Sequence, residues 1–370
     1  MVNNAKNRRL GAGYNRSGST SYGSGSASMA NYGSSAMSRG TFMRGLGLAG
    51  AGVAAGMMGL SGTARAINWG PGPNGEPTYV DDPNNPHYPQ VCAFMYYYNI
   101  PYWRPPGWYI GYSGILIGHK TVLTCAHGPV MAGEPTGVSF DVYPDYLCPS
   151  EVPDCPAPES YYPVKNVYIH PKFNITNAAY MNSIYNNVQY DLAIIELYEP
   201  VDITPLPRLP PYANFIEAEK ANGNINRSAN QFSIAGYGGS YFGEPQKLGM
   251  PHAWINLDDV RKYAEDASSF NAATPFFLYL SAHYKQDQTS VCFGDSGGPF
   301  FYRADTSKPI TDPMTELTLV GVTTGGGTSC QLYEWVSRLD VPEVLDWVKQ
   351  KLCKIEGGTW DETTGTCTYP

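Results

Sequence analysis

The segment Cys292–Pro299, which reads Cys-Phe-Gly-Asp-Ser-Gly-Gly-Pro, constrains the fold of this chain more than any other. Glycine inside a helix or strand costs stability and buries no side chain, so this spacing has a backbone role. Gly294 and Gly297 allow a tight turn in which the amides of Gly294 and Ser296 point at one spot beside the Ser296 hydroxyl. Fixed donors of this kind stabilise charge that develops in a transition state. The segment predicts a nucleophilic serine with an oxyanion hole; the alternative is a glycine-rich loop with an incidental serine.

The positions of the histidines decide which kind of fold presents this serine. A serine hydroxyl needs a base, and that base needs an acid to hold it in one tautomer. The chain has six histidines, and none of them follows Ser296. The segment also fits the G-x-S-x-G elbow of α/β-hydrolases, but that fold places its histidine after the serine. The sequence therefore excludes the α/β-hydrolase fold.

His127 and Asp191 are the best candidates for the base and the acid. His127 follows the run Thr121–Ala126, which predicts a strand ending at a turn of small residues. His170 and His252 adjoin prolines, and we expect each to be a surface or turn histidine. Asp191 precedes an apolar run, and an aspartate that enters a buried strand is costly unless it is paired. A capping role at the start of that strand is the alternative for Asp191.

The order His127, Asp191, Ser296 resembles that of the chymotrypsin (trypsin-like) serine protease family. The resemblance extends from about Val91 to Lys351. The matching segments are 113–117, 123–127, 167–173, 191–197, 235–238, 292–299, 319–322 and 341–348. It implies an all-β fold of two six-stranded antiparallel β-barrels with a C-terminal helix. Short strand patterns, the first at 91–98 and 108–117, are separated by Gly/Pro turns, with convincing helix only near 342–352, and independently favour an all-β class.

The resemblance also implies the chemistry. Ser296 would attack a peptide carbonyl, His127 would move the proton, and Asp191 would orient the imidazole. The amides of Gly294 and Ser296 would form the oxyanion hole. The chain would act as a serine endopeptidase through an acyl-enzyme. We expect no cofactor and no metal, since the cysteines lack Cys-x2-Cys spacing.

Substrate preference follows from the pocket positions of the same family. Ser290, six residues before the nucleophile, corresponds to the pocket base and carries no charge, which favours an apolar or aromatic P1 residue. Thr324 and Gly326 correspond to the segment that binds the substrate backbone as an added strand. Gly325 stands where the family has an aromatic wall. A shortened stretch brings Glu334 near the pocket base as an alternative, in which case basic P1 residues would be preferred.

The sequence divides into five parts by composition and pattern. The expected domains are a disordered leader with a secretory signal at 1–66, an N-terminal arm at 67–90, a first β-barrel with His127 and Asp191 at 91–220, a second β-barrel with Ser296 and the C-terminal helix at 221–352, and a disulfide-closed tail at 353–370. Residues 1–37 are rich in Gly, Ser, Tyr and Asn and too poor in aliphatic side chains to offset ordering entropy. A linker between the barrels is expected near 218–228.

Residues 38–66 have the order of a secretory signal: a charged region, an apolar Gly/Ala-rich run and a small-x-small site ending at Ala66. The charged region is similar to a twin-arginine signal, with Gly40 where the second arginine belongs. An uncleaved anchor is the alternative. Cleavage would make Ile67 the new N-terminus, and the resemblance implies that it pairs with Asp295; a plain extended arm is the alternative. The protein is expected to be secreted.

Eight cysteines and a signal-like front predict an oxidising compartment and four disulfides. The resemblance implies a bridge between Cys292 and Cys330. Nearness in sequence favours two more pairs, and the remaining two cysteines would form the fourth. These further pairs are Cys148–Cys155, Cys353–Cys367 and Cys92–Cys125. Tyr112 and Gly128 stand where the family has cysteines flanking the histidine.

The net charge of −8 and a pI near 5.3 leave no basic face for nucleic acid, so nucleic acid is not expected as a partner. Protein or peptide substrates are the expected partners of a monomer that is not stably associated with a membrane after signal cleavage. Two alternatives are a serine esterase on the same fold and a catalytically silent, secreted binding protein on a protease scaffold. A cell-surface structural protein that keeps its Tyr/Gly/Ser-rich front is a third.

Overall fold

β-Strands make up most of the secondary structure, as the sequence predicts. The computed structural model describes residues 79–80, 88–98, 107–141, 161–173, 190–225, 231–237, 248–250, 277–280, 291, 294–305, 317–326 and 334–370. The predicted strand at 91–98 is present at those bounds, and the strand predicted at 108–117 lies at Gly107–Leu116.

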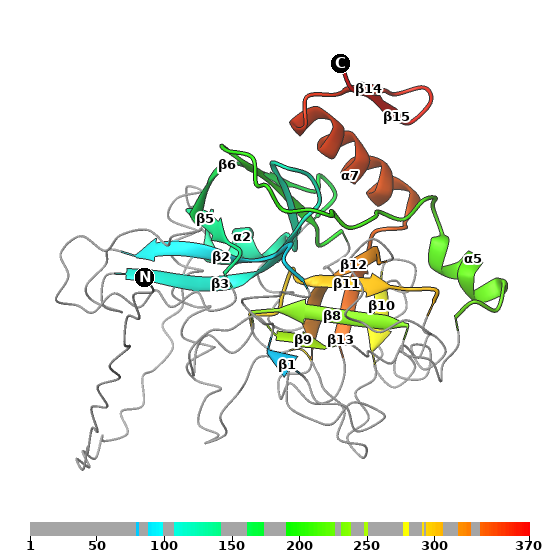
Figure 1. Cartoon of the computed structure of the whole chain (residues 1–370), viewed down its shortest axis with the longest axis horizontal. Coiled ribbons are helices and arrows are strands. Elements are labelled where there is room, and N and C mark those ends of the chain that lie inside the picture. Colours follow the sequence, from blue (N-terminus) through cyan, green and yellow to red (C-terminus); the bar gives the residue numbers. More distant parts are fainter. Residues whose placement is uncertain are drawn as a thin grey trace, which may run out of the picture. The chain divides into compact units, whose positions relative to one another are not determined.

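The first half of the fold is a closed antiparallel barrel of six strands with the order β2-β3-β4-β7-β6-β5 (Figure 1). The strands are β2 Val91–Tyr98, β3 Gly107–Leu116, β4 Thr121–Thr124, β5 Gly137–Ser139, β6 Tyr161–Ile169 and β7 Ala193–Leu197. The closed barrel confirms one of the two barrels that the sequence predicts.

Strands β4 and β7 are buried along their whole length because both of their faces meet a core. Successive side chains of a strand point to opposite faces. Val122 and Ile195 pack into the barrel interior. Leu123 and Ile194 pack on the other side, against residues from the second half of the chain. Burial on both faces therefore explains why apolar residues follow one another directly in the sequences of β4 and β7.

The second half of the fold is a seven-stranded sheet with the order β1-β9-β8-β11-β12-β13-β10. Its strands are β1 Tyr79–Val80, β8 Phe232–Gly236, β9 Leu248–Met250, β10 Phe277–Leu280, β11 Pro299–Tyr302, β12 Thr318–Gly326 and β13 Glu334–Arg338. The described strands thus form one sheet of seven, one more than the six of the predicted second barrel, which stays a prediction. The extra strand, β1, comes from the N-terminal arm and pairs antiparallel with β9.

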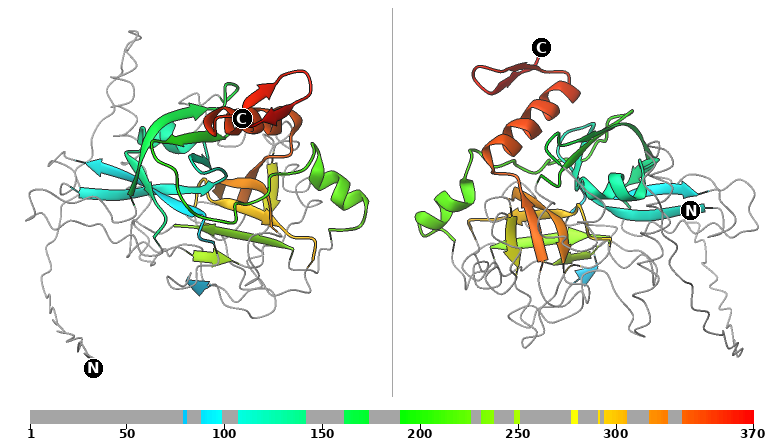
Figure 2. Two further views of the ribbon diagram at one scale, coloured as in Figure 1. Left: turned by 45° about the horizontal axis from the view of Figure 1, so that its top comes forward. Right: turned by 180° about the vertical axis from the view of Figure 1, so that it is seen from behind.

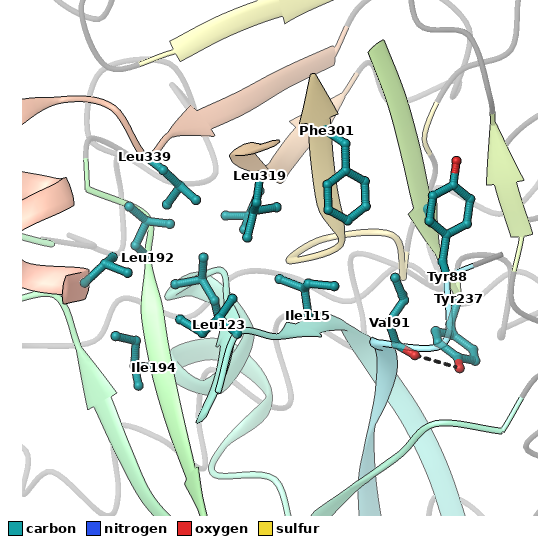
Figure 3. Packing of buried hydrophobic residues seen from close by; sticks show 14 of the residues in the cluster. Tyr88, Val91, Ile115, Leu123, Leu192, Ile194, Tyr237, Phe301, Leu319 and Leu339 are labelled. Carbon is teal, nitrogen blue, oxygen red and sulfur yellow. Dashed lines mark hydrogen bonds between the residues drawn. The ribbon is translucent and has the colours of Figure 1, made fainter. Parts of the chain in front are cut away.

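One hydrophobic core joins the barrel to the sheet. Figure 3 shows Ile115, Leu123 and Ile194 of the barrel facing Phe301 and Leu319 of the sheet. The single proton of the Tyr237 hydroxyl is shared between the carbonyl of Asp141, at 2.8 Å, and that of Val91, at 3.3 Å. Burial of large apolar side chains is the main favourable term in folding. The shared core therefore fixes the barrel and the sheet against each other.

Helix α7, Pro342–Ile355, follows the sheet in sequence but also contacts the barrel (Figures 1 and 2). It is longer at its C-terminal end than the predicted segment 342–352. Val344 and Val348, four residues apart on one face, are buried in the shared core. At the other end of the helix, Glu356 accepts hydrogen bonds from the amide of Lys120, at 2.9 Å, and the hydroxyl of Thr121, at 2.5 Å.

A small hairpin follows α7, formed by β14 Thr359–Asp361 and β15 Thr366–Thr368. The predicted disulfide between Cys353 of the helix and Cys367 of the hairpin is present, with the two Cα atoms 5.7 Å apart. It attaches the chain end to α7. Among the helices of the described ranges, none combines the length and apolar character needed to span a bilayer.

Two short helices were not expected from the sequence. Helix α2, His127–Ala132, begins at the candidate base. His127 therefore lies three residues after the end of β4 and is the first residue of a helix. Helix α5, Phe215–Ala221, overlaps the start of the region predicted as an inter-barrel linker. Phe215 and Ile216 of α5 are buried in a core with Tyr302, so tertiary packing, rather than local helix propensity, supports it.

Candidate active site

The side chains of His127 and Asp191 are in direct contact inside the protein. The ring Nδ1 of His127 lies 2.6 Å from Oδ2 of Asp191, and the backbone amide of His127 donates to Oδ1 at 2.7 Å. Asp191 is 0 % exposed and His127 is 8 % exposed. Because a carboxylate only accepts hydrogen bonds, Nδ1 carries the proton in this pair and Nε2 is the nitrogen able to accept one.

The barrel brings these two residues together. Strands β4 and β7 are antiparallel neighbours, and Thr124 pairs with Ala193. Asp191 lies two residues before Ala193, and His127 lies three residues after Thr124. Both therefore leave the same end of one strand pair, which explains how residues 64 positions apart come into hydrogen-bond contact.

Asp191 is held in place by an ordered turn. Tyr190 has a φ of 60°, a conformation that non-glycine residues rarely adopt, and its carbonyl accepts from the amide of Leu192 at 2.7 Å. The ring of His170 stacks on that of Tyr190 with 4.8 Å between centroids, and it packs edge to face with the ring of Trp347 of α7, also with 4.8 Å between centroids. His170 begins a turn, as one arm of the prediction of a surface or turn histidine has it, and its ring is buried. Burial lowers the pKa of His170 to about 4.

Ser296 occupies a tight turn over residues 295–298. The amide of Gly298 donates to the carbonyl of Asp295 at 2.9 Å, which closes a four-residue turn with Ser296 in its second position. Gly297 has a φ of 80°, as a type II turn requires at its third position. Gly294 also has a positive φ, of 98°. The predicted backbone role of these glycines is thus seen in their conformations.

The turn lies against the strand end that leads to His127. The carbonyl of Ser296 accepts from the amide of Ser113 at 2.8 Å, and the amide of Gly297 donates to the carbonyl of Thr323 at 2.6 Å. A Cβ placed on Gly297 would come 3.0 Å from the amide nitrogen of Cys125, two residues before His127. Only glycine allows this close approach, which brings the Ser296 turn against the backbone of Cys125, two residues before His127.

Asp295 is fully buried beneath the turn. A Cβ at Gly236 of β8 would collide with the Asp295 carboxylate, so the glycine at this position makes room for the acid. The proposed partner of Asp295, Ile67, lies outside the described residues, as does the signal-like segment. The pairing of Ile67 with Asp295 stays a prediction.

The predicted substrate-binding residues fall on β12 and around it. Thr324 is buried, and its hydroxyl lies 2.5 Å from that of Ser337 on β13. Gly326 ends β12 and pairs in register with Glu334 of β13. The backbone of Glu334 therefore neighbours the expected substrate-binding strand. Ser290 lies outside the described residues.

The prediction of a disulfide between Cys92 and Cys125 is wrong. Both residues are buried, but no disulfide joins them, and Cys125 keeps its thiol. Cys92 lies on β2, where it pairs with Gly114 of β3, whereas Cys125 follows β4 on the far side of β3. Strands two places apart in a sheet are separated by about 9–10 Å, beyond the Cα separation of about 7 Å that a disulfide spans. The remaining four cysteines lie outside the described residues; they are Cys148, Cys155, Cys292 and Cys330.

Tyr112 and Gly128 stand where the resemblance implies cysteines flanking the histidine, and the two residues fit each other. A Cβ on Gly128 would lie 2.8 Å from the ring of Tyr112, so the glycine gives room for the ring. Tyr112 also stacks on Phe94 at 4.5 Å. Its burial is the main reason that its pKa lies well above the ordinary value. Aromatic packing therefore supports the start of α2 at this position.

Sequence reasoning missed three contacts of the site. Cys125 Sγ lies 3.7 Å from Nε2 of His127, although the sequence assigned this cysteine to a disulfide. Tyr190 supports Asp191, and Ser113 contacts the Ser296 turn. No local pattern distinguishes Ser113 or Tyr190, because their partners lie far away in the sequence. Within the described ranges, no group of three or more His, Cys, Asp or Glu side chains is arranged to hold a metal ion.

Comparison with known families gives a match that covers most of this architecture. The family model described as Trypsin matches residues 109–348, more than half of the chain. The matched region begins in β3, includes the His127–Asp191 pair and the Ser296 turn, and ends within α7. The all-β class, the closed barrel and the terminal helix agree with it. The chain therefore belongs to the trypsin family and is a trypsin-like serine protease.

Proposed function

We propose that the protein is a secreted serine endopeptidase that uses Ser296, His127 and Asp191 as its catalytic triad. The observation that carries this proposal is the double hydrogen bond between His127 and Asp191. It engages both oxygens of a buried carboxylate and leaves the ring only one orientation. A base held in one tautomer beside a serine turn is what nucleophilic catalysis by serine requires.

In the proposed reaction, the hydroxyl of Ser296 attacks the carbonyl carbon of the scissile peptide bond while Nε2 of His127 accepts its proton. The oxyanion forms against the amides of Gly294 and Ser296. His127 then returns the proton to the leaving amine, which leaves an acyl-enzyme. Water attacks the acyl group while Nε2 of His127 accepts its proton. The bond from the acyl carbon to Oγ of Ser296 then breaks, His127 returns the proton to that oxygen, and the carboxylic acid product departs. Asp191 stabilises the imidazolium without taking the proton.

The turn geometry supports the assignment of Ser296. A type II turn with glycine at its third position places the preceding residue at an exposed corner, and Ser296 is partly exposed whereas its neighbours Asp295 and Gly297 are buried. Positive φ at Gly294 and Gly297 gives the backbone the freedom to direct successive amides to one side. Preorganised donors of this kind contribute about 10²–10³ in rate for each donor.

For specificity, we propose a neutral pocket with Ser290 at its base, which favours an apolar or aromatic P1 residue. Thr324 and Gly326 would bind the substrate backbone along β12. The alternative is a preference for Lys or Arg, and the register of Gly326 with Glu334 is the observation that favours it. A carboxylate beside the pocket would pair with a basic P1 side chain.

The proposal includes export and processing. The charged, apolar and small-residue order of residues 38–66 supports removal of the leader after Ala66 and secretion of the remainder. The disulfide between Cys353 and Cys367 fits an oxidising compartment. N-terminal sequencing of the secreted form tests the cleavage site, and an intact leader in that form would contradict it.

A fluorophosphonate probe tests the catalytic assignment, because it reacts only with an activated serine. The processed protein is expected to be labelled, and labelling is expected to vanish in Ser296→Ala and in His127→Ala. Ser139→Ala is the matched control, because it removes a buried barrel hydroxyl outside the site and should label normally. Absence of labelling in the folded natural sequence would contradict the proposal and favour a silent binding protein.

A peptide library with every P1 residue then reads specificity. Cleavage after Phe, Tyr or Leu would support the neutral pocket, and cleavage after Lys or Arg that is lost in Glu334→Gln would support the acidic one. Labelling by the probe without any peptide cleavage, together with turnover of small esters, would favour a serine esterase.

A further inference from the structure

Ser113 contacts the candidate nucleophile turn through both its backbone and its side chain. It lies on β3 of the barrel and is 0 % exposed. Its backbone amide donates to the carbonyl of Ser296 at 2.8 Å, and its hydroxyl donates to the carbonyl of Gly294 at 2.8 Å. One barrel residue therefore binds the chain on each side of Asp295.

The hydroxyl of Ser113 has a second partner. The backbone amide of Tyr237, the residue directly after β8, donates to the same oxygen at 2.8 Å. A serine hydroxyl has one proton to donate and lone pairs that accept. Its proton goes to the carbonyl of Gly294 and its oxygen accepts from Tyr237, so this buried group joins the nucleophile turn to the sheet.

Ser113 is itself fixed from the other side. Thr124, the last residue of β4, donates its hydroxyl to the carbonyl of Ser113 at 2.7 Å. Thr124 lies three residues before His127. The hydrogen-bonded path from the strand end that carries the candidate base to the turn that carries the candidate nucleophile therefore passes through Ser113.

We infer that Ser113 is a positioning residue that sets the oxyanion-binding geometry of the Ser296 turn, through the hydroxyl that bridges the Gly294 carbonyl and the Tyr237 amide. The inference rests on the proposed function, in which the amides of Gly294 and Ser296 bind the oxyanion. Ser113 does not touch substrate and acts through the backbone of the turn.

The physical reason is the planarity of the peptide group. The bond to the Gly294 carbonyl fixes the peptide plane between residues 294 and 295, and the bond to the Ser296 carbonyl fixes the plane between residues 296 and 297. The Ser296 amide belongs to the peptide between these two planes. Gly294 has a φ of 98° and no side chain to restrict its rotation. The hydrogen bond from the Ser113 hydroxyl, which lies outside the turn, therefore holds the peptide plane that follows Gly294.

Ser113→Ala tests the inference because it removes the hydroxyl and keeps the β3 backbone. The experiment uses the processed full-length protein, with active sites counted by a fluorophosphonate and kinetics measured on a cleaved peptide. We expect kcat per titrated site to fall about 10-fold or more, a fraction of the 10²–10³ lost when an oxyanion donor is removed outright. KM should change by less than about twofold, because ground-state binding is not affected.

A peptide boronate gives a readout that a merely structural role would not move. Its tetrahedral adduct places an oxygen in the oxyanion hole, so its affinity should fall by about the same factor as kcat/KM. Ser139→Ala is the matched control, since it also removes a buried barrel hydroxyl that accepts from a backbone amide, here that of Asp141 at 3.2 Å. Its kcat, KM and boronate affinity should stay within about twofold of the natural sequence.

Thr124→Val keeps the test decisive if Ser113→Ala does not fold. Valine has nearly the shape of threonine but lacks the hydroxyl that holds the Ser113 carbonyl. It should lower kcat and boronate affinity in parallel, by about threefold or more, with KM unchanged.

Several outcomes would overturn the inference. If the role of Ser113 were confined to folding, Ser113→Ala would change only the fraction of titrated sites and would leave kcat per site and boronate affinity unchanged. A rise in KM with kcat preserved would assign Ser113 to substrate binding instead. Absence of probe labelling in the natural sequence would overturn the proposed function and the inference with it, whereas a labelled natural protein with an unaffected Ser113→Ala variant would overturn the inference alone.

Discussion

The hydroxyl of Tyr190 donates a hydrogen bond to Glu343 of α7, so the residue directly before Asp191 is attached to the C-terminal helix. Glu343 also forms an ion pair with Lys172, whose ammonium lies 5.3 Å from the centre of the Tyr190 ring. The lysine and the tyrosine hydroxyl hold the pKa of Glu343 below its ordinary value. The helix that follows the second half of the fold thus supports the acid of the first half.

Tyr190→Phe should weaken this support. The variant keeps the ring on His170 and loses the hydroxyl that donates to Glu343. We expect kcat/KM to fall about threefold, because Asp191 and His127 would be held less firmly in position. The free energy of unfolding should fall by about 0.5–1.5 kcal/mol, the contribution of one hydrogen bond. Steady-state kinetics and urea unfolding measure the two effects. Tyr198→Phe, on an exposed tyrosine just after β7, is the control and should change neither quantity.

The buried His170 predicts a pH dependence of stability. Its pKa is about 4 in the folded protein, against 6.5 in the unfolded chain, so between these values the unfolded chain binds more protons. The contribution of His170 is fully present above about pH 6.5 and is lost as the pH falls toward 4. His170→Phe keeps an aromatic ring between Tyr190 and Trp347 and removes the titration. Thermal unfolding of this variant should decline less steeply between pH 6.5 and 4.5, and equal slopes in the two proteins would contradict the prediction.

Asp191→Asn should inactivate the protein while leaving it folded. An asparagine has nearly the same volume but offers an amide where His127 Nδ1 now finds an acceptor, so the ring would be left in the wrong tautomer. We expect kcat to fall by about 10³–10⁴ with KM nearly unchanged. Circular dichroism and thermal unfolding confirm that the variant is folded. A loss below tenfold would assign Asp191 to a structural role at the head of β7.

Gly297→Ala should disrupt the nucleophile turn. The φ of 80° disfavours any side chain, and a Cβ would collide with the Thr124 hydroxyl and the Ser113 carbonyl. We expect probe labelling to fall by at least about 100-fold and the melting temperature to drop. Gly365→Ala is the matched control, because Gly365 also has a positive φ, of 64°, but has nothing within 4 Å of the added Cβ. Equal effects in the two variants would show that backbone strain alone is responsible.

The corrected cysteine pairing predicts a thiol where a disulfide was expected. The protein, unfolded in guanidinium without a reducing agent, should be alkylated at Cys125 and should not be alkylated at Cys353 or Cys367. Peptide mass spectrometry reads each site. Alkylation of Cys125 only after reduction would contradict the structure at this position.

The sequence predicts much of the chemistry because that information is local. The glycines around Ser296 reveal the turn, since only glycine adopts its backbone conformations. Apolar runs reveal the strand bounds at 91–98 and the terminal helix. The absence of histidine after Ser296 excludes one fold, and the order His127, Asp191, Ser296 indicates the family that the comparison shows.

Other features depend on distances that no local pattern carries. Eight cysteines are an even number, but only the separation of β2 from β4 by an intervening strand shows that Cys92 and Cys125 do not pair. The proline after His170 predicts a surface or turn position, and the turn is present, but only the fold shows that the rings of Trp347 and Tyr190 pack on its ring. A seven-stranded sheet forms in the second half because β1 of the N-terminal arm joins the edge of β9.

The sequence by itself determined which residue types the proposed site contains and in what order, because the proposed nucleophile, base and acid and the turn glycines each have a recognisable local setting. The tertiary structure alone decided how they are held. Ser113 reaches Gly294 across 181 positions, and Tyr190 reaches Glu343 across 153. Hydrogen bonds of this kind depend on which strands and helices become neighbours, and that is set by burial of apolar surface over the whole chain rather than by any short segment.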